Sequence, residues 1–415
     1  MRSRTLQSVL AAAVVFSIAG CGCDQDYPYM RDGFTGDCTP EACSAYCVSV
    51  GQSWGYCDGD ACICWGSGDA GTEWDIPEGR TITVNGTVRS PGGLVPISGA
   101  LVYFGLTEPP PIPSGAYPET CTDPPTPYHT LSSPDGSFSV SVAPGDYWFT
   151  VQKGQFRRVR FITVPDTDPY TITEDLSTLP SDHGEGDTIP SMALVYAMDN
   201  GDHIEDVLAK LEMGDLGPDN TLVHGSEHFD IYNISPYEPN TALLEDVSRM
   251  LSYHIIFFPC TIAGFGQLGD PTNPLSNAGV LSNIRAFLTR GGKIYATDMM
   301  YDIFEQPLPE FADMCGDDTV INAADNEAWA HTETRSGWTS HGQAIQPDLA
   351  AWPDAVGIGS TGIDFLMNFV WIEDLFDIVD PPPDGPQPPM VWVTGDFVLD
   401  PLRTLPLTIT FPYGA

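Results

Sequence analysis

Oxygen-bearing side chains gather just after two segments that are expected to be buried strands. They follow residues 191–196 and 293–297, and they are Asp199, Asn200, Asp202, Asp298, Asp302 and Glu305. Because the carboxyl ends of parallel strands meet at one edge of a sheet, both groups are expected at the same edge. Carboxylate oxygens suit calcium, so the four aspartates are candidate ligands of a calcium cofactor. Helix capping and plain solvation are the alternative, since Asp202 precedes an expected helix.

Cys260 directly follows residues 253–259, which form a third expected strand of the same sheet. Its thiol is therefore a candidate nucleophile at the edge where ligands bind. A nucleophile needs a base within hydrogen-bond reach, and no local motif supplies one, which makes His331 and His341 the histidines to examine. A buried cysteine, or a disulfide with Cys315, is the alternative. The histidines show no ligand spacing such as HExxH, so no zinc site is expected.

Most of the 11 cysteines lie near the start of the chain. After Cys21 and Cys23 come six in a short segment: Cys38, Cys43, Cys47, Cys57, Cys62 and Cys64. A segment with so little core, if exported, is expected to be held by disulfides rather than by a metal. Cys43 and Cys47 fall on one face of a helical turn, whereas Cys62 and Cys64 fall on one face of a strand. Two parallel bridges could join these faces, although spacing alone leaves the pairing open.

The order C…CxxxC…GxC…CxC over residues 38–64 resembles the cysteine-stabilised αβ motif of defensins and scorpion toxins. The resemblance implies three disulfides, which are Cys38–Cys57, Cys43–Cys62 and Cys47–Cys64. Membrane-disrupting defensins are cationic, but this segment has acidic residues and no Lys or Arg. We therefore expect a structural or recognition module here rather than an antimicrobial effector.

The first residues have the character of a cleavable export signal. Arg2 and Arg4 precede an apolar run at 9–18 that is too short to span a bilayer, which needs ~20 apolar residues. The following Ile-Ala-Gly-Cys ending at Cys21 resembles the lipobox of bacterial lipoproteins. The resemblance implies removal of residues 1–20 and lipidation of Cys21, and Gly22 in place of Asp implies sorting to the outer membrane. An ordinary secretory signal with a chance cysteine is the alternative.

Composition narrows the range of partners. There are 56 acidic and 16 basic residues, for a formal net charge of −40. A surface this negative repels phosphate groups, so we do not expect nucleic acid to be a partner. Anionic lipid head groups are repelled in the same way. Membrane attachment would depend on the lipid. With 38 Pro and 41 Gly, strands and turns are favoured over long helices.

Short alternating segments at regular spacing predict a β-sandwich over residues 80–165. The runs NGTV, GALVYF and SPDGSFSVSVAPGDYWFTV are similar to the carboxypeptidase regulatory-like (transthyretin-like) domain. That resemblance implies a non-catalytic spacer or binding module. The Pro-rich insertion at 108–127, which carries Cys121, is expected to be a surface loop.

From residue 191 onward, strand and helix patterns alternate, which predicts an α/β domain with a doubly wound, mostly parallel sheet. The segments SMALVYAMDNGDHIEDVLAKL, YHIIFFPCT and NIRAFLTRGGKIYATDMMYD look like the class I glutamine amidotransferase-like fold, nearest its trehalose-utilisation-like branch. Catalytic members carry a cysteine on the turn after the fourth strand. Asp298, Met299 and Met300 stand there instead, so thiol catalysis at that turn is not expected, and whether the chain is an enzyme stays open.

Together these patterns predict a multidomain exported lipoprotein. Its expected parts are a signal (1–20), a lipidated tether (21–37), a disulfide-rich αβ module (38–65), a linker (66–79), a β-sandwich (80–165), a linker (166–190) and an α/β domain (191–415). A non-catalytic protein that binds a ligand, glycan polymer or protein partner at the cell envelope is expected. A hydrolase at the sheet edge and a displayed defensin-like effector are the alternatives. The final strand at 405–415 ends in a turn, which suggests a truncated domain.

Overall fold

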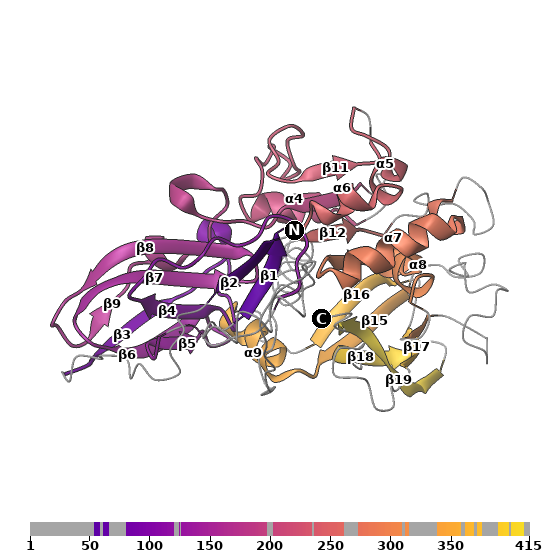
Figure 1. Cartoon of the computed structure of the whole chain (residues 1–415). Helices are drawn as coiled ribbons and strands as arrows, with labels where there is room; N and C mark the ends of the chain where they lie inside the picture. The colour runs from indigo at the N-terminus through magenta and orange to yellow at the C-terminus, as the bar shows by residue number, and fades with distance from the viewer. Residues whose placement is uncertain are drawn as a thin grey trace.

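The computed structural model describes most of the chain from residue 80 onward and two earlier strands. The described residues are 54–58, 61–65, 80–119, 124, 126–196, 202–234, 236–260, 273–308, 312–314, 338–357, 362–368, 372–375, 389–397 and 400–410. Several sheets, parallel and antiparallel, and a few helices form a multidomain α/β arrangement. No helix within these residues is long and apolar enough to cross a membrane. Figure 1 shows the early antiparallel strands at the left, the parallel sheet with its helices at the upper centre and right, and the last strands at the lower right.

The first described element is an antiparallel pair, β1 (Trp54–Asp58) and β2 (Ala61–Trp65). In its register Cys57 lies opposite Cys62. The second strand carries the expected CxC run. The other cysteines of the proposed motif lie outside the described residues.

Two sheets follow in residues 80–171, in the orders β6-β3-β9 and β5-β4-β7-β8. Their strands are β3 (Ile82–Thr87), β4 (Leu101–Gly105), β5 (His129–Leu131), β6 (Ser137–Val142), β7 (Gly145–Lys153), β8 (Phe156–Val164) and β9 (Tyr170–Thr171). The pattern in β6 is typical of a strand with one buried face, since Phe138, Val140 and Val142 are buried and the residues between them are not. Buried side chains from both sheets belong to one core cluster.

The segment expected as a linker at 166–190 contains part of this structure. It provides β9, which pairs with β3, together with α3 (Glu174–Ser177) and the 3₁₀ turn η2 (Gly184–Gly186). Ile172, Leu179 and Ile189 are buried in the same core. The segment therefore packs against the sheets that precede it.

Four strands form an all-parallel sheet in the order β11-β10-β12-β13. They are β10 (Met192–Val195), β11 (Asp230–Tyr232), β12 (Ile255–Phe258) and β13 (Lys293–Ala296). The helices between them are α4 (Ile204–Lys210), α5 (Asn240–Leu244), α6 (Val247–Leu251), η3 (Pro274–Ser276) and α7 (Ala278–Thr289).

The two faces of this sheet are covered by different partners. Met192, Leu194 and Phe257 point to the side of α4 and join the core that also contains the antiparallel sheets. The residues that alternate with them, such as Ala193 and Phe258, pack with α5, α6 and α7 in a second core. Strand period two thus sorts the side chains to opposite faces, and the antiparallel sheets share one face with α4.

The elements after β13 form two further sheets. After η4 (Asp298–Met300) and α8 (Asp302–Glu305), the sheets are antiparallel, in the orders β14-β17 and β16-β15-β18-β19. The strands are β14 (Ala312–Met314), β15 (Trp338–Ala344), β16 (Gly362–Asn368), β17 (Ile372–Leu375), β18 (Met390–Phe397) and β19 (Asp400–Thr410), with α9 (Pro347–Ala355) after β15. The doubly wound sheet accordingly occupies only the first part of residues 191–415.

Two contacts join distant parts of the chain. Trp352 of α9 is buried, and its indole N–H donates to the carbonyl oxygen of Pro96 at 3.0 Å. The loop after β4, expected to lie on the surface, packs by Ala116 against the second core. The Ala116 N–H donates to the carbonyl oxygen of Leu251 at 2.9 Å. The early sheets and the parallel sheet are therefore in direct contact.

Candidate functional site

The order of the parallel strands creates a switch point. The chain passes from β10 outward to β11, then crosses back to β12 on the other side of β10. In open α/β sheets, ligands bind at the carboxyl ends of the strands where the winding direction reverses. The candidate site is therefore the edge at the carboxyl ends of β10, β12 and β13.

Three residues at this edge form a closed hydrogen-bonded set. The Asp202 N–H donates to the carbonyl oxygen of Cys260 at 3.1 Å, and the Cys260 N–H donates to Oγ1 of Thr297 at 2.7 Å. The Thr297 hydroxyl then donates to Oδ2 of Asp202 at 2.6 Å. Segments following β10, β12 and β13 are thus fixed to one another.

Two of these residues, Asp202 and Cys260, were expected at this edge from the sequence, and the structure brings them together. Thr297 was missed, although a hydroxyl residue directly after a buried strand is a signal that could have found it. Below them, Tyr295 lies half-buried in β13. Burial raises the pKa of its hydroxyl, and the negative charge of Asp202 adds to the effect. Asp202 is therefore close enough to act electrostatically on a side chain beneath the edge.

The other calcium candidates have different surroundings. Asp298 begins η4 with φ of +43°, a left-handed conformation that is uncommon for a residue other than glycine. Burial raises the pKa of Asp302 to about 8, against a weaker opposing hydrogen bond from the Gln306 side chain. Oδ1 of Asp302 is buried and lacks a hydrogen-bond partner. Burial therefore favours the protonated form of Asp302, and a protonated carboxyl group is a poor ligand for calcium.

A different set of ligand-type side chains does come together. Among the described residues, the group with ligand atoms within 4.8 Å of one another is His203, Glu205 and Asp206. Nδ1 of His203 lies 2.8 Å from Oε1 of Glu205. That hydrogen bond raises the pKa of His203 against the opposing effect of burial, and the charges of Glu205, Asp206 and Asp202 add to the rise. Within the described residues, Asp202, Asp298 and Asp302 do not form such a group.

This group has one histidine, so it does not match the paired-histidine spacing by which a zinc site is recognised in a sequence. The signal that could have found it is the run His-Ile-Glu-Asp at residues 203–206, directly before and within the first turn of α4.

An aromatic cluster lies beside the carboxyl end of β10. The His224 ring lies between Tyr196, which follows β10, and Tyr237, with centroid distances of 5.9 and 6.0 Å. The Tyr237 hydroxyl donates to Glu227 at 2.5 Å; burial and this bond raise the pKa of Tyr237 to about 12. The rings meet edge-to-face and at a tilt, with interplanar angles of 68° and 55°, so they form an aromatic cluster with a polar rim.

Cys260 is half-buried at the end of β12. Of the two histidines considered as its base, His341 is exposed on β15, with Nδ1 2.7 Å from Oδ1 of Asp364. His331 lies outside the described residues, as do Asp199, Asn200, Cys315 and the cysteines at 21, 23, 38, 43, 47 and 121.

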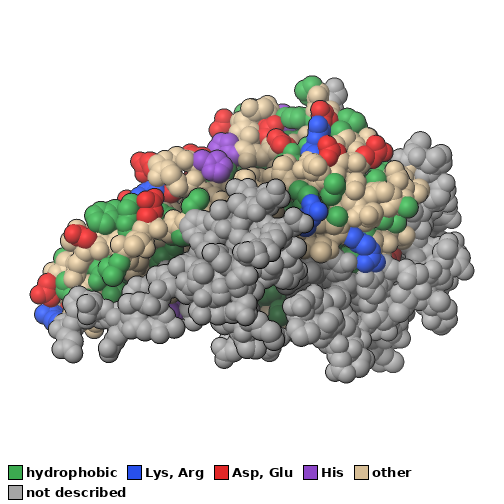
Figure 2. All heavy atoms as spheres, viewed as in Figure 1, with side chains coloured by type: hydrophobic (Ala, Val, Ile, Leu, Met, Phe, Trp, Pro, Cys, Tyr) green, Lys and Arg blue, Asp and Glu red, His purple; other side chains and the backbone are tan. Residues whose placement is uncertain are grey.

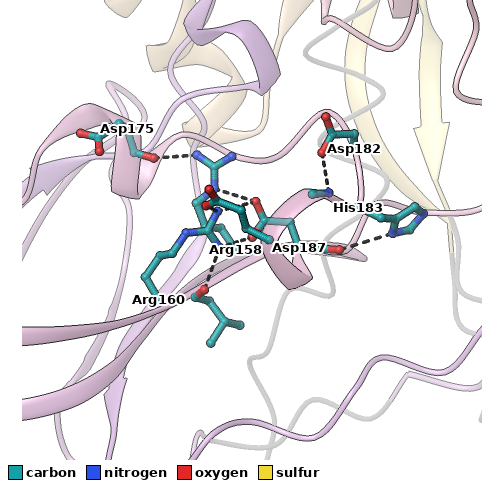
Figure 3. Close-up of polar contacts among 9 residues, drawn as sticks. Arg158, Arg160, Asp175, Asp182, His183 and Asp187 are labelled. Atoms are coloured by element: carbon teal, nitrogen blue, oxygen red, sulfur yellow. Dashed lines mark hydrogen bonds and ion pairs between the residues drawn. The ribbon is translucent and has the colours of Figure 1, made fainter.

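A cationic cluster outside this edge was also missed. Arg158 and Arg160 on β8 both bind the buried carboxylate of Asp187, with N···O distances of 3.0 and 2.6 Å (Figure 3). Arg158 also donates to the carbonyl oxygen of Asp175 at 2.7 Å. The hydrogen bond to Asp187 raises the pKa of Arg160. The arginines are neutralised internally, so this cluster holds residues 174–188 on β8 and is not an anion site.

Comparison with known proteins adds no assignment. No family model matches the chain, and no curated protein does.

Proposed function

We propose that the chain is an exported lipoprotein anchored through Cys21, whose parallel sheet binds a ligand at its carboxyl edge without covalent catalysis. The observation that carries the ligand site is the hydrogen-bonded set Asp202–Cys260–Thr297 at the switch point. The support for the anchor is the lipobox-like run ending at Cys21. The ligand is a glycan polymer or a protein of the cell envelope.

The finer domain assignments belong to the same proposal. The antiparallel pair β1–β2 supports a cysteine-stabilised αβ module over residues 38–65, with the three disulfides named above. The sheets of residues 80–171 support a carboxypeptidase regulatory-like domain. The parallel sheet with order β11-β10-β12-β13 supports an amidotransferase-like domain. If the last assignment is right, Asp298, which has a positive φ, corresponds to the turn that carries the cysteine in catalytic members of that fold.

The anchor is tested with the variant Cys21→Ser expressed in a bacterial host. The unmodified chain should sediment with outer membranes and incorporate radiolabelled fatty acid, whereas the variant should do neither. Cys23→Ser is the matched control and should behave as the unmodified chain. Loss of labelling in both variants, or in neither, would refute lipidation at Cys21.

The ligand site is tested by co-sedimentation of the mature chain with insoluble cell-wall polysaccharide. Thr297→Val removes the hydroxyl that joins Cys260 to Asp202 while keeping the side-chain shape, and it should weaken binding. Thr289→Val, at the end of α7, is the control and should bind normally. Equal binding by both variants would place the ligand elsewhere.

A hydrolase is the second candidate, because the histidine–carboxylate pair His203–Glu205 begins one residue after Asp202, whose N–H donates to the carbonyl oxygen of Cys260. If Cys260 is a nucleophile activated by this pair, hydrolysis of p-nitrophenyl acetate should disappear in Cys260→Ala. The binding proposal expects no difference between Cys260→Ala and the unmodified chain. The two functions are thereby separated in one assay.

A further inference from the structure

The buried carboxylate of Glu205 has one oxygen atom without a hydrogen-bond partner, which a cation could bind. Its side chain is only 4% exposed, and its Oε1 lies against Nδ1 of His203. The second oxygen, Oε2, is buried and has no hydrogen-bond partner. A buried carboxylate oxygen without a partner is costly, because the lost hydration is not replaced.

Among the described residues, the charged groups that act on the His203 imidazole are carboxylates. Asp206 belongs to the same group of ligand atoms within 4.8 Å, and both Asp206 and Asp202 act on His203 as negative charges. Oδ1 of Asp206 accepts the Leu222 N–H at 2.7 Å, which orients this carboxylate and leaves its other oxygen for a ligand. Such outer contacts are typical of side chains that bind metals.

We propose that His203, Glu205 and Asp206 bind a divalent transition-metal ion of the zinc type. One imidazole nitrogen and two carboxylates suit Zn²⁺, whereas Ca²⁺ takes six to eight oxygens. The His203 side chain is 45% exposed, so one side of the ion faces solvent. Three protein ligands with water in the remaining position match the pattern of zinc sites that keep an open coordination position.

This site differs from the calcium rim predicted from the sequence, and it does not depend on the proposed polysaccharide ligand. The metal also has a structural consequence. It would bind at the start of α4, where Asp206 already accepts the Leu222 N–H and so contacts the segment that carries His224.

The test is a titration of the metal-free mature chain with ZnCl₂ at physiological salt, followed by calorimetry. With a net charge of −40, diffuse binding of cations is expected, so excess Mg²⁺ is present throughout. The unmodified chain should bind one Zn²⁺ tightly, and Co²⁺ in its place should give d–d absorption bands. His203→Ala and Glu205→Gln should each weaken binding by more than about 10–100-fold, the loss that follows from removing only an outer-shell partner.

The matched control is His341→Ala, because His341 is also exposed and also pairs with a carboxylate, at 2.7 Å. It should keep the affinity of the unmodified chain. Circular dichroism checks that each variant is folded; if Glu205→Gln fails to fold, His203→Ala decides, since its side chain is half exposed. Unchanged affinity in His203→Ala, or Zn²⁺ binding that Mg²⁺ abolishes, would overturn the proposal.

Discussion

At the residue scale, a few buried polar side chains hold segments that are distant in sequence. Asp187 binds two arginines of β8, and His254 links the parallel sheet to the loop after β4. Nδ1 of His254 accepts the Ser191 N–H at 2.8 Å, and its Nε2 lies 2.9 Å from the carbonyl oxygen of Pro113. Both residues are buried, so each contact is sensitive to substitution.

Replacing Asp187 with Asn should destabilise the fold. The Asp187 side chain is 3% exposed and its arginine partners 18% and 20%. Removing its charge takes the buried counter-ion from both guanidinium groups and leaves Arg160 only its ion pair with the exposed Glu185. We expect a loss near the lower end of the ~3–5 kcal/mol that breaking a buried pair costs, measured by chemical denaturation. Asp182→Asn, exposed in the same region, is the control. Equal effects of the two substitutions would contradict this account.

Stability should fall in acid partly through His254. Burial lowers its pKa, assisted by the charge of Lys293 and opposed by the bond to Pro113. The unfolded chain therefore binds the proton more tightly than the folded one, and the contribution is present above about pH 6.5 and lost as pH falls below it. His254→Gln should flatten the dependence of unfolding free energy on pH in that window. His228→Gln, exposed, should keep the profile of the unmodified chain.

At the residue scale, the sequence predicted the positions of some site residues and not of others. Asp202 and Cys260 could be placed at one edge because each directly follows a buried strand. The role of Thr297 could not be predicted, since it arises from hydrogen bonds between segments that meet only in the folded chain. Glu205 pairs with His203 two residues away, but the burial of its carboxylate also depends on the folded chain. The same holds for Asp187 and the arginines of β8.

At the scale of elements, hydrophobic periodicity predicted the strands β10, β12 and β13 and the helix α7 closely. The sequence pattern over residues 241–251 predicts a single helix, whereas the structure has two, α5 and α6. Asp246 interrupts it, because its carboxylate accepts the N–H groups of Ser248 and Arg249 and starts a new helix. β9 was missed because it has only two residues, too few for a periodic pattern.

The contact between the loop after β4 and the end of α7 can be tested at Gly291. Its φ is +85°, and a Cβ there would lie 1.9 Å from the carbonyl oxygen of Tyr117. Gly291→Ala should therefore both strain the backbone and displace the loop. Gly357→Ala is a matched control, because Gly357 also follows a helix with φ of +75° but has nothing within 4 Å of its Cβ position.

We expect Gly357→Ala to lower the free energy of unfolding by about 1 kcal/mol or slightly more, which is the strain of a left-handed residue with a side chain. Gly291→Ala should lower it clearly more. Thermal denaturation measures both. Equal losses of stability in the two variants would mean that the loop after β4 moves away from residue 291 without an energetic cost.

At the scale of the whole molecule, charge and core organisation are the main features. Acidic side chains are scattered along the upper edge of the described surface, with few basic ones among them (Figure 2). The core that begins between the antiparallel sheets continues to the α4 face of the parallel sheet. The sequence predicted separate modules joined by a linker at 166–190; it could not show this shared core, because burial between distant segments leaves no periodic signal.

A shared core should make the two regions open together. Leu179, in the 166–190 segment, and Leu194, in β10, are both fully buried in it. Leu179→Ala and Leu194→Ala should each cost about 2–5 kcal/mol. Hydrogen exchange should then accelerate in β7 and in β12 in both variants. Acceleration confined to β7 in one variant and to β12 in the other would show that the regions unfold independently.

The shared core also determines how the chain could be divided or recombined. A cut within residues 166–190 would remove Ile172, Leu179 and Ile189 from their neighbours and leave apolar surface on both products. The antiparallel sheets are therefore not a cassette that can be exchanged between proteins, whatever family they resemble. A chimaera that carries the parallel sheet to a new carrier would need to begin before residue 80, so that the shared core stays intact.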